Sequence, residues 1–150
     1  MRTRTALAAA LTVALAGGAL SPALAAPAKP KPVKKEYVAT AFPPDPSHVA
    51  VTSGICNTTN PTSQHNEPFT VPFAGTLVVD MNGFVGDWDL ALYSDKGSLM
   101  ASSAQDMTAD PQSPEKMTVK LKKKGAKVFI RACNFAGGPT ANVKYVHTSF

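Results

Sequence analysis

The sequence predicts an all-β protein, an antiparallel β-sandwich or jelly roll of about seven or eight strands held by one disulfide. Short segments in which apolar and polar residues alternate are typical of strands with one buried face. Turn signals rich in Gly, Pro, Asn and Asp separate these segments. After the first 25 residues, no stretch of ten residues shows the 3.6-residue period of a helix.

The first 25 residues are predicted to be a Sec-type signal peptide. Arg2 and Arg4 provide a positive start, residues 6–16 provide an apolar core, and residues 23–25 (Ala-Leu-Ala) form the site that signal peptidase recognises. This apolar core is too short for a membrane span of about 20 residues, and no later stretch is longer. The sequence therefore predicts a secreted, extracellular bacterial protein with no transmembrane segment after signal removal.

Residues 26–46 are predicted to form a flexible Pro/Lys-rich arm with an irregular lead-in, and residues 47–150 a single β-sandwich domain. The arm is a spacer or a basic anchor for anionic cell-envelope polymers. From residue 36 onward the chain holds 9 basic and 10 acidic residues, so its body is nearly neutral. This balance argues against a nucleic-acid partner, because nucleic-acid modules carry a basic excess on the folded body.

The predicted strands run from residue 48 to the C-terminus. The first, 48–55, leads into Cys56, and residues 57–66 form a polar loop. Alternation then places strands within 67–73, 76–81, 87–93, 98–103, 116–121, 128–132 and 143–150.

Cys56 and Cys133 are the only cysteines of the chain. An even count in an exported protein predicts a disulfide, because that compartment is oxidising. The alternative is a metal site with two cysteine ligands, but the companion Cys or His residues at zinc-binding spacing are missing.

The strand at 87–93 carries the most distinctive pattern. Trp88, Leu90 and Leu92 fall on one side, and Asp87 and Asp89 fall on the other. The tryptophan is therefore predicted to lie in the core.

The two aspartates, with Asp80 and Asn82 as helpers, are candidate calcium ligands, because calcium takes six to eight oxygen ligands. The competing interpretation is that Asp87 and Asp89 accept hydrogen bonds from backbone N–H groups of the neighbouring turn, or simply face water. We favour the turn, and expect no cofactor.

No catalytic motif is present in the sequence. There is no Gly-x-Ser-x-Gly elbow, no His-Glu-x-x-His helix and no Gly-rich phosphate loop. The histidines His48, His65 and His147 stand in no motif that selects them. We therefore expect a non-catalytic protein and keep a small secreted hydrolase as a remote alternative.

Four segments together resemble the bacterial pre-peptidase C-terminal domain. They are residues 72–79 (Pro-Phe-Ala-Gly-Thr-Leu-Val-Val), 86–93 (Gly-Asp-Trp-Asp-Leu-Ala-Leu-Tyr), 115–119 (Glu-Lys-Met-Thr-Val) and 126–132 (Ala-Lys-Val-Phe-Ile-Arg-Ala). The resemblance covers about residues 66–148, and its Asp-x-Asp-Leu strand is the most specific motif. It implies a β-sandwich module of the kind found behind secreted proteases, some relatives of which bind collagen or calcium. No protease is attached here, so this chain would be a stand-alone form.

The sequence thus leads to a secreted, non-catalytic accessory or binding module. Its expected partner is another secreted protein or a cell-envelope polymer, and the chain is expected to be a monomer. The alternative is a calcium-stabilised extracellular domain for adhesion or for binding matrix or polysaccharide.

Overall fold

The computed structural model describes residues 28–44, 56, 60–104 and 114–150. Within them the chain forms eight β-strands and one short 3-10 helix (Pro61–Ser63), and no α-helix. The strands are β1 (Val33–Thr40), β2 (Gln64–Thr70), β3 (Gly75–Asn82), β4 (Gly86–Ser94), β5 (Leu99–Ser103), β6 (Glu115–Leu121), β7 (Lys127–Gly137) and β8 (Thr140–Ser149). The all-β prediction is confirmed.

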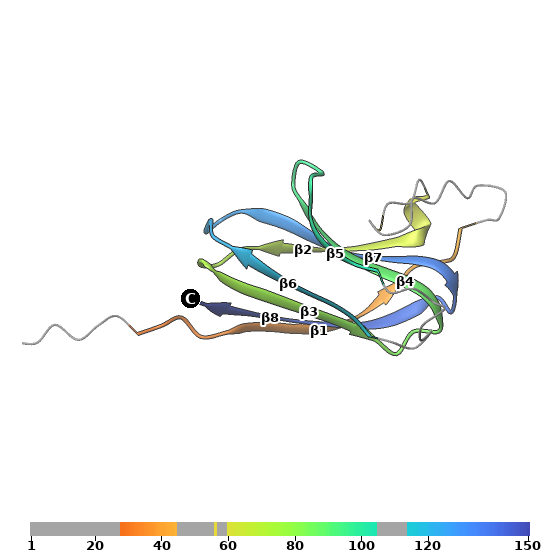
Figure 1. The fold of residues 1–150 in the computed structure, drawn as a ribbon, viewed down its shortest axis with the longest axis horizontal. Helices are drawn as coiled ribbons and strands as arrows, with labels where there is room; N and C mark the ends of the chain where they lie inside the picture. The colour runs from red at the N-terminus through yellow and green to blue at the C-terminus, as the bar shows by residue number, and fades with distance from the viewer. Residues whose placement is uncertain (1–27, 45–55, 57–59, 105–113) are drawn as a thin grey trace, which may run out of the picture.

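The strands form two four-stranded sheets that face each other (Figure 1). One sheet has the order β1-β8-β3-β6 and the other β2-β7-β4-β5. Every pairing is antiparallel. The predicted sandwich is therefore confirmed.

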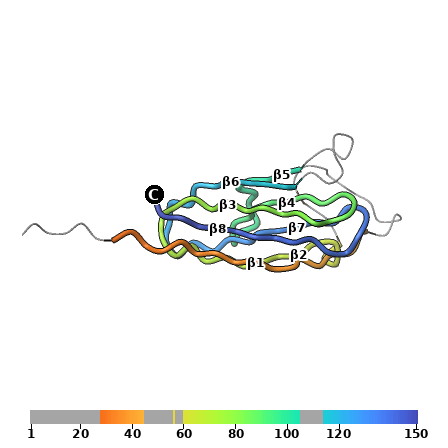
Figure 2. The backbone as a smooth tube through the Cα atoms, turned by 90° about the horizontal axis from the view of Figure 1, so that it is seen from below, coloured from red at the N-terminus to blue at the C-terminus, as the bar shows by residue number. Residues whose placement is uncertain are grey.

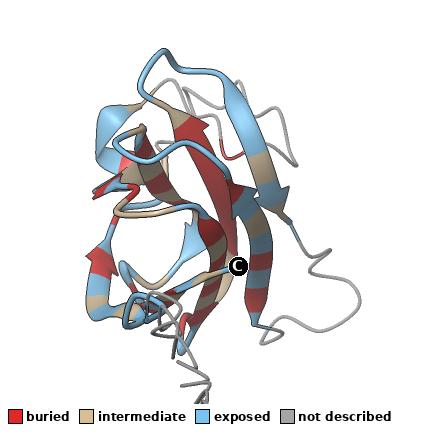
Figure 3. Cartoon of the chain, turned by 90° about the vertical axis from the view of Figure 1, so that its left-hand side faces the viewer, coloured by how far each residue is buried: buried red, intermediate tan, exposed pale blue. Residues whose placement is uncertain are grey.

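The core lies between the sheets, where the alternating apolar residues meet. Along β3, buried residues alternate with half-exposed ones, and Figure 3 shows such bands on several strands. Each large apolar side chain that is fully buried stabilises the fold by about 1.5–3 kcal/mol. Large, fully buried apolar side chains include Leu77, Val79 and Met81 from one sheet, and Trp88, Leu90, Leu92 and Ile130 from the other.

Trp88 lies in the core as predicted, and its polar atom is satisfied there. The side chain is 1% exposed, and its indole Nε1 donates a hydrogen bond to the Gly138 carbonyl at 3.2 Å. Buried Asn134 donates from Nδ2 to the same carbonyl and to that of Ala41, both at 2.9 Å. These bonds tie the end of β1 and the β7–β8 turn to the core.

Polar side chains close both long edges of the sandwich, where β1 lies beside β2 and β5 beside β6 (Figure 2). At the first edge, Lys35 forms an ion pair with Glu67. This hydrogen bond raises the pKa of the Lys35 ammonium. At the second edge, the hydroxyl of Ser103 donates to the carboxylate of buried Glu115.

The position of β1 corrects the predicted boundary of the domain. The sequence places 26–46 in a flexible arm, but Val33–Thr40 forms a strand paired along its whole length with β8. Lysines in this segment obscured the pattern, because several of them face solvent at the sheet surface and the edge. Farther along the strand, Ala39 belongs to the core and Tyr37 packs against it.

Two further points concern the start of the chain's body. The predicted strand 48–55 lies outside the described residues. The predicted loop at 57–66 ends sooner than expected, because β2 already begins at Gln64 and pairs with Cys133.

Across the described ranges, no helix has the length and apolar character needed to cross a membrane.

Candidate functional site

The four candidate calcium ligands are divided between the two sheets. Asp87 and Asp89 lie on β4, whereas Asp80 and Asn82 lie on β3 of the other sheet. Their core-facing neighbours point into the space between the sheets, so the two pairs point outward on opposite sides of the sandwich. Among the described residues, no group of three or more His, Cys, Asp and Glu side chains could hold a metal ion.

Asp89 is buried rather than exposed on a solvent face. It is 4% exposed and lies opposite Cys133 in the register of β4 and β7. Its side of β4 is covered by a small buried cluster, made of Cys56, Ala91, Tyr93 and Cys133. The strand is therefore buried on both sides at this point. Whether Asp87 and Asp89 hold the preceding turn stays a prediction.

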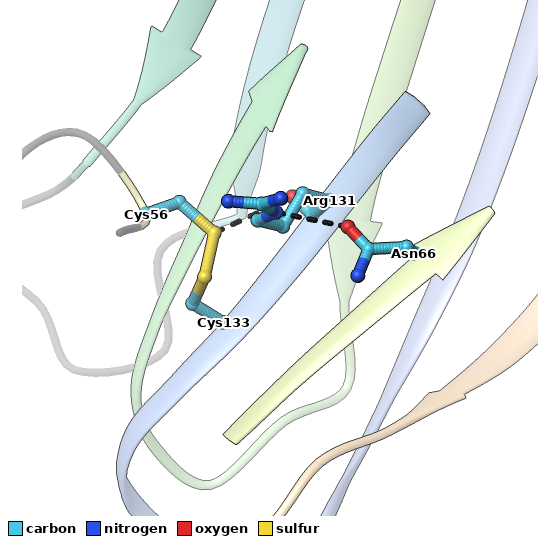
Figure 4. The surroundings of a disulfide bond; sticks show 4 residues. All are labelled: Cys56, Asn66, Arg131 and Cys133. Carbon is cyan, nitrogen blue, oxygen red and sulfur yellow. Dashed lines mark hydrogen bonds between the residues drawn. A yellow bond between two sulfur atoms is a disulfide. The ribbon is translucent and has the colours of Figure 1, made fainter. Parts of the chain in front are cut away.

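The predicted disulfide is confirmed, and it lies on the outward side of β2-β7-β4-β5, which we call the disulfide face. Cys56 and Cys133 are joined over a sequence separation of 77 residues, and both are fully buried. Cys56 Sγ lies 3.6 Å from the carbonyl oxygen of Arg131 (Figure 4). The bond thus fixes Cys56 against the inner strand β7.

Arg131 organises the rest of the disulfide face. Its Nε donates to Asn66 Oδ1 on β2 at 2.9 Å (Figure 4). Its guanidinium carbon lies 4.3 Å from the centre of the Tyr93 ring on β4. A cation over an aromatic ring contributes about 0.5–1 kcal/mol at an exposed position. These residues contact one another across β2, β7 and β4, and their contacts stabilise this sheet.

The two described histidines are held by packing contacts, and His48 lies outside the described residues. The ring of His65 stacks on Tyr37 at 5.5 Å, and its Nδ1 accepts a hydrogen bond from the backbone of Thr40 at 3.4 Å. His147 is fully buried and stacks on Phe73 at 4.7 Å. Neither ring nitrogen of His147 has a hydrogen-bond partner among the described residues.

His147 should make the fold sensitive to acid. Burial lowers the pKa of His147 below its ordinary value of 6.5, so the folded protein keeps this ring neutral. As the pH falls below about 6.5, the unfolded chain binds a proton that the folded chain refuses. The free energy of unfolding then falls by up to about 1.4 kcal/mol per pH unit until the folded pKa is reached.

His147→Phe should remove this part of the pH dependence, because phenylalanine keeps an aromatic ring beside Phe73 and cannot be protonated. Urea unfolding of both proteins at several pH values between 7 and 5 measures the effect. Equal slopes for the two proteins would show that His147 is not the group responsible.

The outward side of β1-β8-β3-β6, which we call the open face, presents polar side chains to solvent. Its residues are those that alternate with the buried ones in each strand. At one end it is hollowed into an open groove of about 500 Å³. The groove is lined by Glu36, Tyr37, Val38, Asn82, Asn142, Val143 and Lys144.

Four polar side chains of this groove are available to a ligand. Within the described residues, Glu36, Asn82, Asn142 and Lys144 make no side-chain hydrogen bond or ion pair. They come from three neighbouring strands, β1, β8 and β3. Beside them Val38 is 56% exposed. The groove therefore offers a carboxylate, an ammonium group, two amides and an apolar surface to a ligand.

Sequence reasoning singled out only one of these groove residues, Asn82, and for a different site. Glu36 falls in the segment predicted to be an arm. Asn142 and Lys144 alternate with buried Val143 and Tyr145, which is a signal that they face outward. The registers that bring them beside Glu36 and Asn82 join residues about 60 to 110 positions apart in the chain, and alternation does not determine them.

The fold is a β-sandwich with two different faces. Side chains of the disulfide face contact one another, and side chains of the open face point into solvent. The chain matches no protein-family model. A search of curated proteins likewise found no match for it.

Proposed function

We propose that this chain is an exported, non-catalytic interaction module that binds another secreted protein or a cell-envelope polymer through its open face. The observation that carries the proposal is the groove, where four polar side chains have no hydrogen-bond or ion-pair partner in the described part of the chain. On the opposite face, by contrast, Arg131 lies over the ring of Tyr93, and Tyr93 packs in the buried cluster that contains the disulfide.

Three further observations support the proposal. The sequence resembles the pre-peptidase C-terminal domain over residues 66–148, and members of that family are accessory modules of secreted proteases. His65 and His147, two of the three histidines that could serve a hydrolase as a general base, are engaged in ring packing. The predicted signal peptide supports export.

The test compares a groove variant with a variant on the disulfide face. Asn142→Arg places a large cation in the groove, whereas Ser102→Arg makes the same change on β5, opposite Ala91. Both positions are exposed, so both variants should fold. The probes are insoluble peptidoglycan, measured by co-sedimentation, and the culture's secreted proteins, captured on the immobilised chain.

Asn142→Arg should reduce the bound amount about tenfold, and Ser102→Arg should leave it unchanged. Equal binding by both variants, or no binding to either probe by the unaltered chain, would contradict the proposal.

A further inference from the structure

One row of side chains across the open face alternates in charge. The registers place Glu36 opposite Lys144, Lys144 opposite Asp80, and Asp80 opposite Lys116. Read across β1, β8, β3 and β6, which Figure 2 shows side by side, the row is negative, positive, negative, positive. Asp80 and Lys116 form an ion pair at 3.3 Å. Glu36 and Lys144 have no ion pair within the described residues.

The neighbouring row has an apolar centre. It consists of Lys34, Val146, Val78 and Thr118 in the same strand order. The two valines are half-buried at the middle of the face, and the polar residues stand at its rims.

When two copies of the open face are placed against each other in one orientation, these two rows match in charge and in apolar character. A second open face, turned about a two-fold axis parallel to the strands, presents each row in reverse order. Each carboxylate of the charged row then meets an ammonium group of the partner, and Val78 meets the partner's Val146. Turning about an axis across the strands instead places like charges opposite one another, which is unfavourable.

We propose that the open face pairs with the open face of a second copy of this chain, about a two-fold axis parallel to the strands. The contacts are Glu36 with the partner's Lys116 and Lys144 with the partner's Asp80, each made twice by symmetry. This inference rests on the proposed function, because it assigns a second copy of the chain as the partner of the same open face. It replaces the monomer expected from the sequence, which carries no information about the cross-strand rows.

The size of the face determines how strong such a dimer is. Four strands spaced by about 4.8 Å and about seven residues long cover roughly 450 Å² of flat area. Two twisted sheets pack face to face with their strands within about 30° of each other, so the central rows stay in contact. A polar interface of this size belongs to the weak class, and its charge contacts make it sensitive to salt.

The experiment is sedimentation velocity of the mature chain over a concentration series, at about 50 mM and about 500 mM NaCl. The unaltered chain should dimerise, and the dimer should weaken at high salt. Glu36→Lys puts a lysine opposite the partner's Lys116 and should weaken dimerisation at least about tenfold, as should Lys116→Glu. The double variant E36K/K116E exchanges the two charges and should restore the dimer.

Lys127→Glu, an exposed charge reversal at the start of β7, is the matched control and should leave the dimer unchanged. A monomer at every concentration would overturn the inference. So would a dimer that the single variants leave intact, or single-variant losses that E36K/K116E does not repair. A monomer that still binds peptidoglycan or a secreted protein, and loses this binding with Asn142→Arg, would overturn the dimer while leaving the proposed function intact.

Discussion

Replacing both cysteines by alanine should lower the free energy of unfolding by about 4 kcal/mol. The bond joins residues separated by 77 positions, and closing so long a loop restricts the unfolded chain strongly. Cys56 and Cys133 also lie in a buried cluster with Ala91 and Tyr93, so the change loosens the covering of β4. Urea unfolding of C56A/C133A and of the unaltered chain measures the difference.

The reduced form of the unaltered chain is the control for this prediction, because it loses the bond and keeps both side chains. It should lose a similar amount of stability. A loss below about 1 kcal/mol in both forms would mean that the bond contributes little to the fold.

Trp88→Ala should cost about 3–5 kcal/mol, because it empties a large volume at the centre of the sandwich. The side chain is 1% exposed and packs within the main core. The change also leaves the Gly138 carbonyl without the indole donor, although Asn134 still donates to that carbonyl. Most of the loss should therefore come from packing. The melting temperature and the urea midpoint both report it.

Trp88→Phe separates the two contributions. Phenylalanine retains a six-membered ring in the core and removes the five-membered ring with its Nε1 hydrogen bond, which is worth about 1 kcal/mol. We expect this variant to lose less than half of what Trp88→Ala loses. Equal losses would place the importance of Trp88 in the part of the indole that phenylalanine lacks.

The sequence predicted those features that depend on local pattern. Leu77, Val79 and Met81 alternate with polar residues, and all three lie in the core. Trp88 lies there too, on the side of its strand that alternation indicates. Counting cysteines in a chain with a predicted signal peptide was enough to predict the disulfide, because only one pairing exists.

Features that depend on contacts between distant segments could not be predicted. Asp89 alternates with core residues and so was expected on the outward side. The structure shows that this side is itself covered at Cys56, and no alternation within β4 reveals such a cover. Likewise Glu36 and Lys144 are neighbours only because β1 pairs with β8 in one register. The candidate site was therefore missed, although its residue types were in plain view.

We infer that the open face pairs with the open face of a second copy of this chain. The most direct measurement is a dilution series of amide nitrogen–proton NMR spectra of the mature chain, with residues assigned. Amides of β8 and β3, around Lys144 and Asp80, should shift with concentration, while those of β7 around Arg131 stay constant. Spectra that do not change on dilution, or shifts confined to Arg131 and Tyr93 on the disulfide face, would contradict this pairing.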